Sequence, residues 1–143
     1  MTFPYSIDAE QSLVTITYEE PVTFERWRRT VEAIFAEATY RPGFDFLGDR
    51  RGVQKAPSVS YVESIVEFVS AHGAKLEGAR WANVVPSGDR AMYGMGYMID
   101  VMTGRSPITA KTFDDHAQAL TWLRDRGAGG LNAVERRAEP PRQ

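Results

Sequence analysis

Three clusters of charged and polar residues follow predicted strands of this sequence, and these are the places where binding chemistry is expected. They are Asp49-Arg50-Arg51, Ser87-Gly88-Asp89-Arg90 and Asp114-Asp115-His116. The carboxyl ends of parallel strands meet at one edge of a sheet, where ligands of α/β proteins gather. Arginines beside the free amides of a helix N-terminus would bind an anion there. The structural alternative is an ion pair within the first cluster, with helix N-caps at Asp89 and Asp114.

The stretch 89–102 carries four methionines at helical spacing and predicts a helix that is apolar on nearly every side. Methionine fills irregular gaps in a core, so the simpler interpretation is a central core helix. The alternative is an adaptable apolar groove for a ligand or a protein partner. The residues expected to line that groove are Met92, Met95, Tyr97 and Met98.

Residue types that common catalytic and metal sites need are scarce in this sequence. There is no cysteine, which excludes a disulfide, a thiolate metal site and a cysteine nucleophile. His72 and His116 have no companion ligands at metal-site spacing. Gly94-Met95-Gly96 lies inside a helical pattern and does not follow a strand, unlike a dinucleotide-binding fingerprint. We therefore expect no catalytic residue, no metal and no cofactor, and a protein that is not an enzyme.

Composition and charge set the broad class of protein. A chain of 143 residues with 43% hydrophobic and 25% charged residues is typical of a single globular domain. The net charge of −2 does not favour phosphate backbones, so nucleic acid is not an expected partner. No run is long and apolar enough for a membrane span, and the N-terminus lacks a signal-peptide pattern. These features, with the absence of cysteine, predict a cytoplasmic protein.

Alternating strands and helices are expected to position the three clusters. The expected strands are 3–8, 13–19, 44–48, 80–85 and 108–113. The first two should form an antiparallel hairpin. Thr23 is expected to cap the first helix, Ser60 and Glu63 have capping-box spacing for the second, and Gly73 should end it. The third helix is 89–102, and Asp114 should cap the fourth.

This order predicts an α/β fold with a single five-stranded, mostly parallel sheet. Strands covered on both faces are usually continuous apolar runs. Here polar residues interrupt the strands, namely Thr15, Thr17, Asp45, Asn83, Thr109 and Lys111. We therefore expect four helices mainly on one face, with the other face partly polar and open to solvent or a partner. The domain should span 1–126, followed by a flexible tail at 127–143.

Five segments of the chain resemble, in consistent order, segments of bacterial proteins in the SpoIIAA-like branch of the STAS superfamily. The segments are 22–25, 40–53, 80–86, 91–95 and 112–123. The resemblance implies a five-stranded sheet wound as successive βα turns. Its implied relatives include anti-anti-sigma factors, which bind proteins and are switched by serine phosphorylation. They also include the CRAL-TRIO carriers of apolar ligands.

The chain departs from these relatives at two places. Phospho-switched members carry an Asp-Ser-Ser-Gly-like element at the start of the second helix, where this chain has Ser58 and Ser60 as the nearest serines. Tyr97 stands where relatives often have an arginine. The expected function is a non-catalytic regulatory or protein-binding module, which binds a partner or itself through the open sheet face or the 89–102 helix. The alternative is a carrier of a small apolar ligand in a pocket near that helix.

Overall fold

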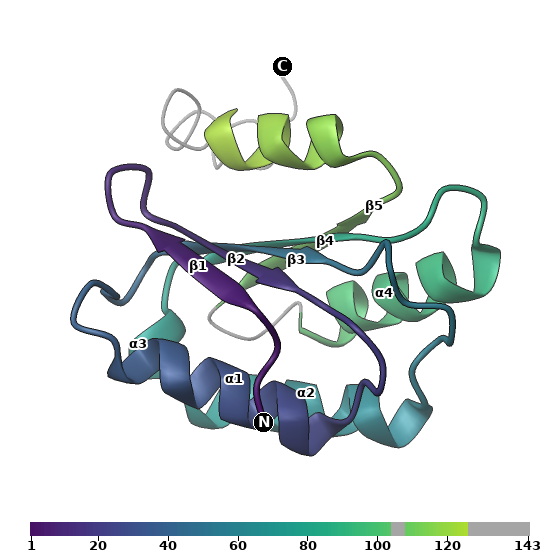
Figure 1. Cartoon of the computed structure of the whole chain (residues 1–143), viewed down its shortest axis with the longest axis horizontal. Helices are drawn as coiled ribbons and strands as arrows, with labels where there is room; N and C mark the ends of the chain where they lie inside the picture. Colours follow the sequence, from purple (N-terminus) through teal and green to yellow (C-terminus); the bar gives the residue numbers. More distant parts are fainter. Residues whose placement is uncertain (104–107, 126–143) are drawn as a thin grey trace.

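Five strands form one mixed sheet whose order follows the chain, β1-β2-β3-β4-β5 (Figure 1). The computed structural model describes residues 1–103 and 108–125, so the predicted tail at 127–143 lies outside the described residues. The strands are β1 (Tyr5–Asp8), β2 (Leu13–Thr17), β3 (Asp45–Asp49), β4 (Arg80–Val84) and β5 (Thr109–Phe113). β1 pairs antiparallel with β2, and every later pair is parallel. The predicted sheet with its N-terminal hairpin is confirmed.

Helices lie against both faces of this sheet (Figure 1). The helices on one face are α1 (Phe24–Ala36), α2 (Val59–Ala71), α3 (Gly73–Leu76) and α4 (Arg90–Met102). A further helix, 116–125, follows β5 and lies on the opposite face. Three of the four predicted helices therefore share one face, whereas the fourth covers part of the face that was expected to stay open.

Two predicted helix caps are wrong by one or two residues. The cap of α2 is Ser58, whose Oγ accepts a hydrogen bond from the Tyr61 amide at 3.1 Å, and not Ser60. The last helix begins after Asp115, whose Oδ1 accepts from the Gln118 amide at 2.9 Å. In both places several cap-forming residues stand in a row, and packing of the first turn decides between them. The short helix α3 was not predicted, because Gly73 was expected to stop the helical chain.

The larger core lies between the sheet and helices α1, α2 and α4. Alternate strand residues point into it, as the two-residue period of a strand requires. Phe46 and Trp81 stack with ring centres 4.1 Å apart, and Trp27 of α1 stacks on Trp81 at 5.9 Å. Val14 and Ile16 extend this layer across β2 and are fully buried. This core fixes the three long helices relative to the sheet.

A smaller core lies on the opposite face, under helix 116–125. Leu47, Ala82 and Val84 from the sheet meet Leu123 and Ala119 of the helix. The Arg80 guanidinium lies over the Trp122 ring, 3.9 Å from its centre, and adds a cation–π contact. The helix thus covers the middle of this face, while Ser6 and Thr17 on the first two strands stay exposed.

Replacing Leu123 with Ala should destabilise the fold by about 2–4 kcal/mol, because the change leaves a cavity in the smaller core. Urea denaturation followed by far-UV circular dichroism measures the difference. The matched control is Thr121→Ala, since Thr121 is exposed on the same helix. Equal stability of the two variants would show that helix 116–125 is not packed on the sheet.

Candidate functional site

The structure divides the first predicted cluster between the two faces of the sheet. Arg51 binds the Asp49 carboxylate through two nitrogens, at 2.9 and 2.8 Å, and this hydrogen bonding lowers the pKa of Asp49. Arg50 is only 5% exposed and lies in the larger core. Arg50 therefore lies apart from Asp49 and Arg51, and ligand binding by this cluster stays a prediction. Strand alternation carried one step past β3 would have placed Arg50 on the side of Phe46 and Gly48.

Arg50 contacts two tyrosines, Tyr18 and Tyr61. Its Nη2 donates a hydrogen bond to the Tyr61 hydroxyl at 3.1 Å, and its guanidinium lies 3.9 Å from the centre of the Tyr18 ring. The Trp27 indole donates to the Tyr18 hydroxyl at 3.1 Å. Burial raises the pKa of Tyr18 far above its usual value, although the Arg50 charge opposes this shift. Tyr18 therefore stays neutral and does not balance the charge of Arg50.

The second and third clusters meet at a shallow hollow of about 370 Å³. Asp89 caps α4 there, with its Oδ1 accepting from the Met92 amide at 2.9 Å. Gly88, Arg90 and Asp114 also line the hollow. Ser87, the residue before Gly88, is exposed. Asp89 is thus a helix N-cap, which is the role that the sequence analysis gave as the alternative to ligand binding. The hollow presents two carboxylates and one guanidinium, a mixed charge that does not favour an anion.

The predicted methionine groove does not form as one surface. Met92 is 1% exposed, and Met95 and Met98 pack against the larger core. Tyr97 points the other way and is 61% exposed. Met92, Met95 and Met98 therefore follow the simpler interpretation as core residues, and only Tyr97 of the predicted set lies on an open apolar surface.

That surface is the α4 outer face, which we define by Tyr93, Gly94, Tyr97, Val101 and Met102. All five are exposed in the described part of the chain, and Val101 is 59% exposed. Tyr93, Tyr97 and Val101 are spaced by four residues and form one line along the helix. A Cβ atom added at Gly94 would meet no heavy atom within 4 Å. The sequence signal for this face is the lack of any charge between Arg90 and Asp100.

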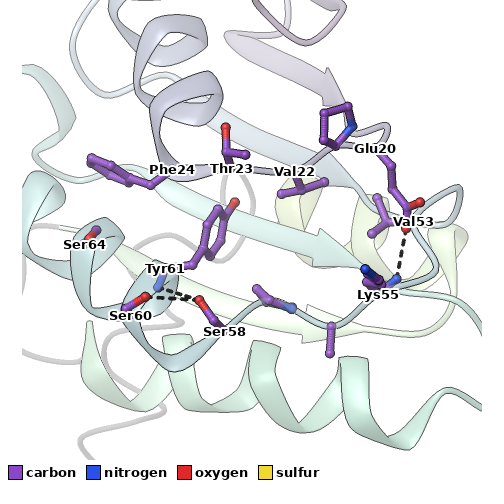
Figure 2. Close-up of a pocket in the computed structure, with 13 residues that line it drawn as sticks. Glu20, Val22, Thr23, Phe24, Val53, Lys55, Ser58, Ser60, Tyr61 and Ser64 are labelled. Carbon is purple, nitrogen blue, oxygen red and sulfur yellow. Dashed lines mark hydrogen bonds between the residues drawn. The ribbon is translucent and has the colours of Figure 1, made fainter.

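An open groove of about 700 Å³ lies at the carboxyl ends of β2 and β3, beside the starts of α1 and α2 (Figure 2). The Tyr61 side chain points from α2 toward Val22 and Thr23 (Figure 2). The groove is lined by Glu20, Pro21, Val22, Thr23, Phe24, Val53, Lys55, Ala56, Pro57, Ser58, Ser60, Tyr61 and Ser64. Sequence reasoning missed this groove, although hydroxyl residues beside two helix starts were a signal for it.

The two predicted phosphorylation candidates lie on the rim of this groove. Ser58 and Ser60 are exposed, and their hydroxyl oxygens are 3.2 Å apart. On the far side, the Glu20 carboxylate accepts hydrogen bonds from the Gln54 and Lys55 amides at 2.9 and 3.1 Å. These bonds tie the connection before α1 to the loop before α2 and so shape the groove.

Asp100 is the one acid of α4 with a strongly shifted pKa. Burial raises its pKa to about 6, and a hydrogen bond from the Thr112 hydroxyl, at 3.3 Å, opposes the shift. Gly96 makes the close approach of α4 to β5 possible, because a Cβ atom there would lie 2.5 Å from Thr112 Oγ1. The carboxylate is held half-buried at the edge of the α4 outer face.

Residues 1–103 and 108–125 contain no helix with the length and apolar character needed to cross a membrane. In the same residues, no three His, Asp or Glu side chains form a group that would hold a metal ion. Comparisons with protein-family models, curated proteins and solved structures find no match to this chain. The resemblance to SpoIIAA-like proteins therefore rests on its five sequence segments alone.

Asp100→Asn should raise stability at pH 7.5 by about 1–2 kcal/mol, allowing for partial exposure. The folded-state pKa lies above the usual 3.8, so the ionised carboxylate opposes folding above pH 6. As pH falls from 6 to below 3.8, the folded protein takes up the proton first and the benefit of Asn disappears. Thermal unfolding from pH 3.5 to 8 tests this, with the exposed Asp125→Asn as control. A benefit that does not depend on pH contradicts the assignment.

Proposed function

We propose that this protein is a cytoplasmic, non-catalytic regulatory module that binds protein through the α4 outer face. The observation that carries the proposal is the exposure of Tyr93, Tyr97, Val101 and Met102 on one helix face. Contiguous exposed apolar surface on a folded domain is a mark of an interaction site, and tyrosine is enriched at such sites. The resemblance to STAS-type modules, whose relatives include protein-binding regulators, supports the same function.

The partner that this face fits best is a second copy of the chain. In a two-fold interface the same patch contacts itself. We place the two-fold axis perpendicular to α4, so that the two α4 helices run antiparallel. That arrangement brings the exposed Arg90, near the start of one helix, toward the end of the other helix. Gly94, near the middle, presents no side chain and lets the helix backbones approach closely.

The size of the apolar contribution is consistent with a dimer. Each large apolar side chain contributes about 1.5–3 kcal/mol when fully buried. Each copy supplies four such side chains, those of Tyr93, Tyr97, Val101 and Met102, so two copies supply eight. Each of them is already partly covered in the single chain. The free energy gained by burying them further is of the same order as the cost of association, which is about 4–15 kcal/mol.

Sedimentation equilibrium should give a mass of twice the 16.0 kDa chain at micromolar concentration. Tyr97→Asp should shift the protein to the monomer, because it places two carboxylates within the apolar contact. The control Thr121→Asp adds the same charge on the opposite face of the sheet and should leave the dimer intact. A wild-type protein that is monomeric up to high concentration, for any reason including cover by another part of its own chain, overturns the proposal.

A second candidate function is the binding of a small molecule in the groove of Figure 2. Its volume of about 700 Å³ falls in the range of small-molecule sites, and it lies where α/β proteins bind ligands. Val22, Phe24 and Val53 provide apolar contact area, while the hydroxyls of Thr23 and Ser64 provide polar contacts. Such a ligand would lie beside α1 and α2 and not beside the methionines of α4.

Native mass spectrometry of freshly purified protein tests this second function. A ligand would appear as an added mass, and Ser64→Trp should remove at least nine-tenths of it, because the indole would fill the groove. The control Ser70→Trp places the same ring on an exposed residue of α2 that does not line the groove. An added mass that persists in Ser64→Trp, or no added mass at all, counts against a ligand in this groove.

A further inference from the structure

A small, partly open space of about 20 Å³ lies in the larger core, between the sheet and helices α1, α2 and α4. Its polar lining residues are Tyr18, Arg50, Asn83 and Thr103. Its apolar lining residues include Ile65, Val69, Ile99, Ile108 and Ala110. A cavity holds a water-sized particle once it offers about 10–15 Å³ by this kind of measure. This core cavity therefore admits one particle slightly larger than a water molecule.

Two buried polar atoms, on residues that line this cavity, have no partner among the described residues. They are Arg50 Nη1 and Asn83 Oδ1, and each residue is only 5% exposed. Asn83 lies against Gly48, where a Cβ atom would be 2.7 Å from Asn83 Oδ1. A glycine on β3 thus makes room for a buried carboxamide on β4. Buried polar groups without partners are rare, because each one costs free energy.

The charge of Arg50 also has no counter-charge nearby. The ion pairs of the described residues use Arg26, Arg28, Arg29 and Arg51, and none of them uses Arg50. Tyr61 and Tyr18 give Arg50 a hydroxyl acceptor and a ring face, both of them uncharged contacts. A guanidinium taken out of water is strongly disfavoured unless an anion pairs with it. A water molecule would satisfy the hydrogen bond but would leave the charge unbalanced.

We propose that the core cavity is a binding site for a single monatomic anion of halide size, which Arg50 binds through Nη1. Asn83 supplies the second polar contact. Its carboxamide has an oxygen and an NH2 group at nearly equal positions, and half a turn of the side chain directs the NH2 toward the anion. Oδ1 accepts no hydrogen bond from the described residues, so turning the side chain breaks none. The low dielectric of the surrounding core strengthens the attraction between the charges.

The site is internal, so its occupancy affects the packing of the helices around it. Tyr61 connects the two regions, since its hydroxyl accepts from Arg50 and its ring lines the groove of Figure 2. Through Ile99, the cavity also touches the buried side of α4. The bound anion is thus a structural ion of the core, and it is independent of whether α4 forms a dimer.

The test is thermal unfolding in sodium gluconate that is progressively replaced by sodium bromide at constant ionic strength. Gluconate is too large for the core cavity, whereas bromide fits it. The unfolding temperature of the wild type should rise by about 2–4 °C when bromide exceeds its dissociation constant several-fold, relative to Arg50→Met. The matched control Arg51→Met removes the same charge from the neighbouring, exposed residue and should keep the wild-type response. An equal response in Arg50→Met and the wild type overturns the proposal.

A second measurement does not depend on the folding of the Arg50 variant. Crystals of the wild type grown or soaked in sodium bromide should show an anomalous bromine peak beside Arg50 Nη1. The peak should be absent from crystals of Arg50→Met where these are obtained. A water molecule in the cavity without anomalous signal, or bromide only at the protein surface, overturns the proposal.

Discussion

The stacking of Phe46 on Trp81 is the contact on which most of this structure depends. It lies where β3 and β4 pair in parallel, and α1 reaches it through Trp27. Because strand residues alternate, placing these rings on one face sends Leu47 and Ala82 to the other face. One strand register therefore sets both the larger core and the smaller core. The helices on both faces follow from that register.

Much of the fold could be predicted from the sequence because local signals agree with the tertiary packing. Thr23 caps α1 as predicted, and the Pro42-Gly43 turn forms, with Gly43 at a φ of +96° and the Phe44 amide donating to the Arg41 carbonyl. Where several capping residues stand in a row, as at Ser58 and Ser60, local chemistry does not distinguish them. Helix 116–125 lies on the opposite face, where Ala119 and Leu123 pack against Leu47, Ala82 and Val84, and no local pattern shows this.

The candidate sites were harder to predict, because each depends on which way a side chain points. The α4 sequence is apolar on nearly every side, so it does not tell Met92, which is buried, from Tyr97, which is exposed. Arg50 looks like a loop residue by its neighbours, and only the strand period extended past Asp49 places it in the core. The groove of Figure 2 joins residues about 35 positions apart, a distance at which a single sequence gives no direct signal.

The bonds from the Gln54 and Lys55 amides to Glu20 have a mechanical consequence for this groove. One carboxylate bridges the connection that follows β2 and the loop that follows β3. These hydrogen bonds link the two walls of the groove, so a displacement of one wall should also move the other. A ligand that enters the groove would have to be narrow enough to pass the bridge. Otherwise it would have to compete with the Gln54 and Lys55 amides for the Glu20 carboxylate.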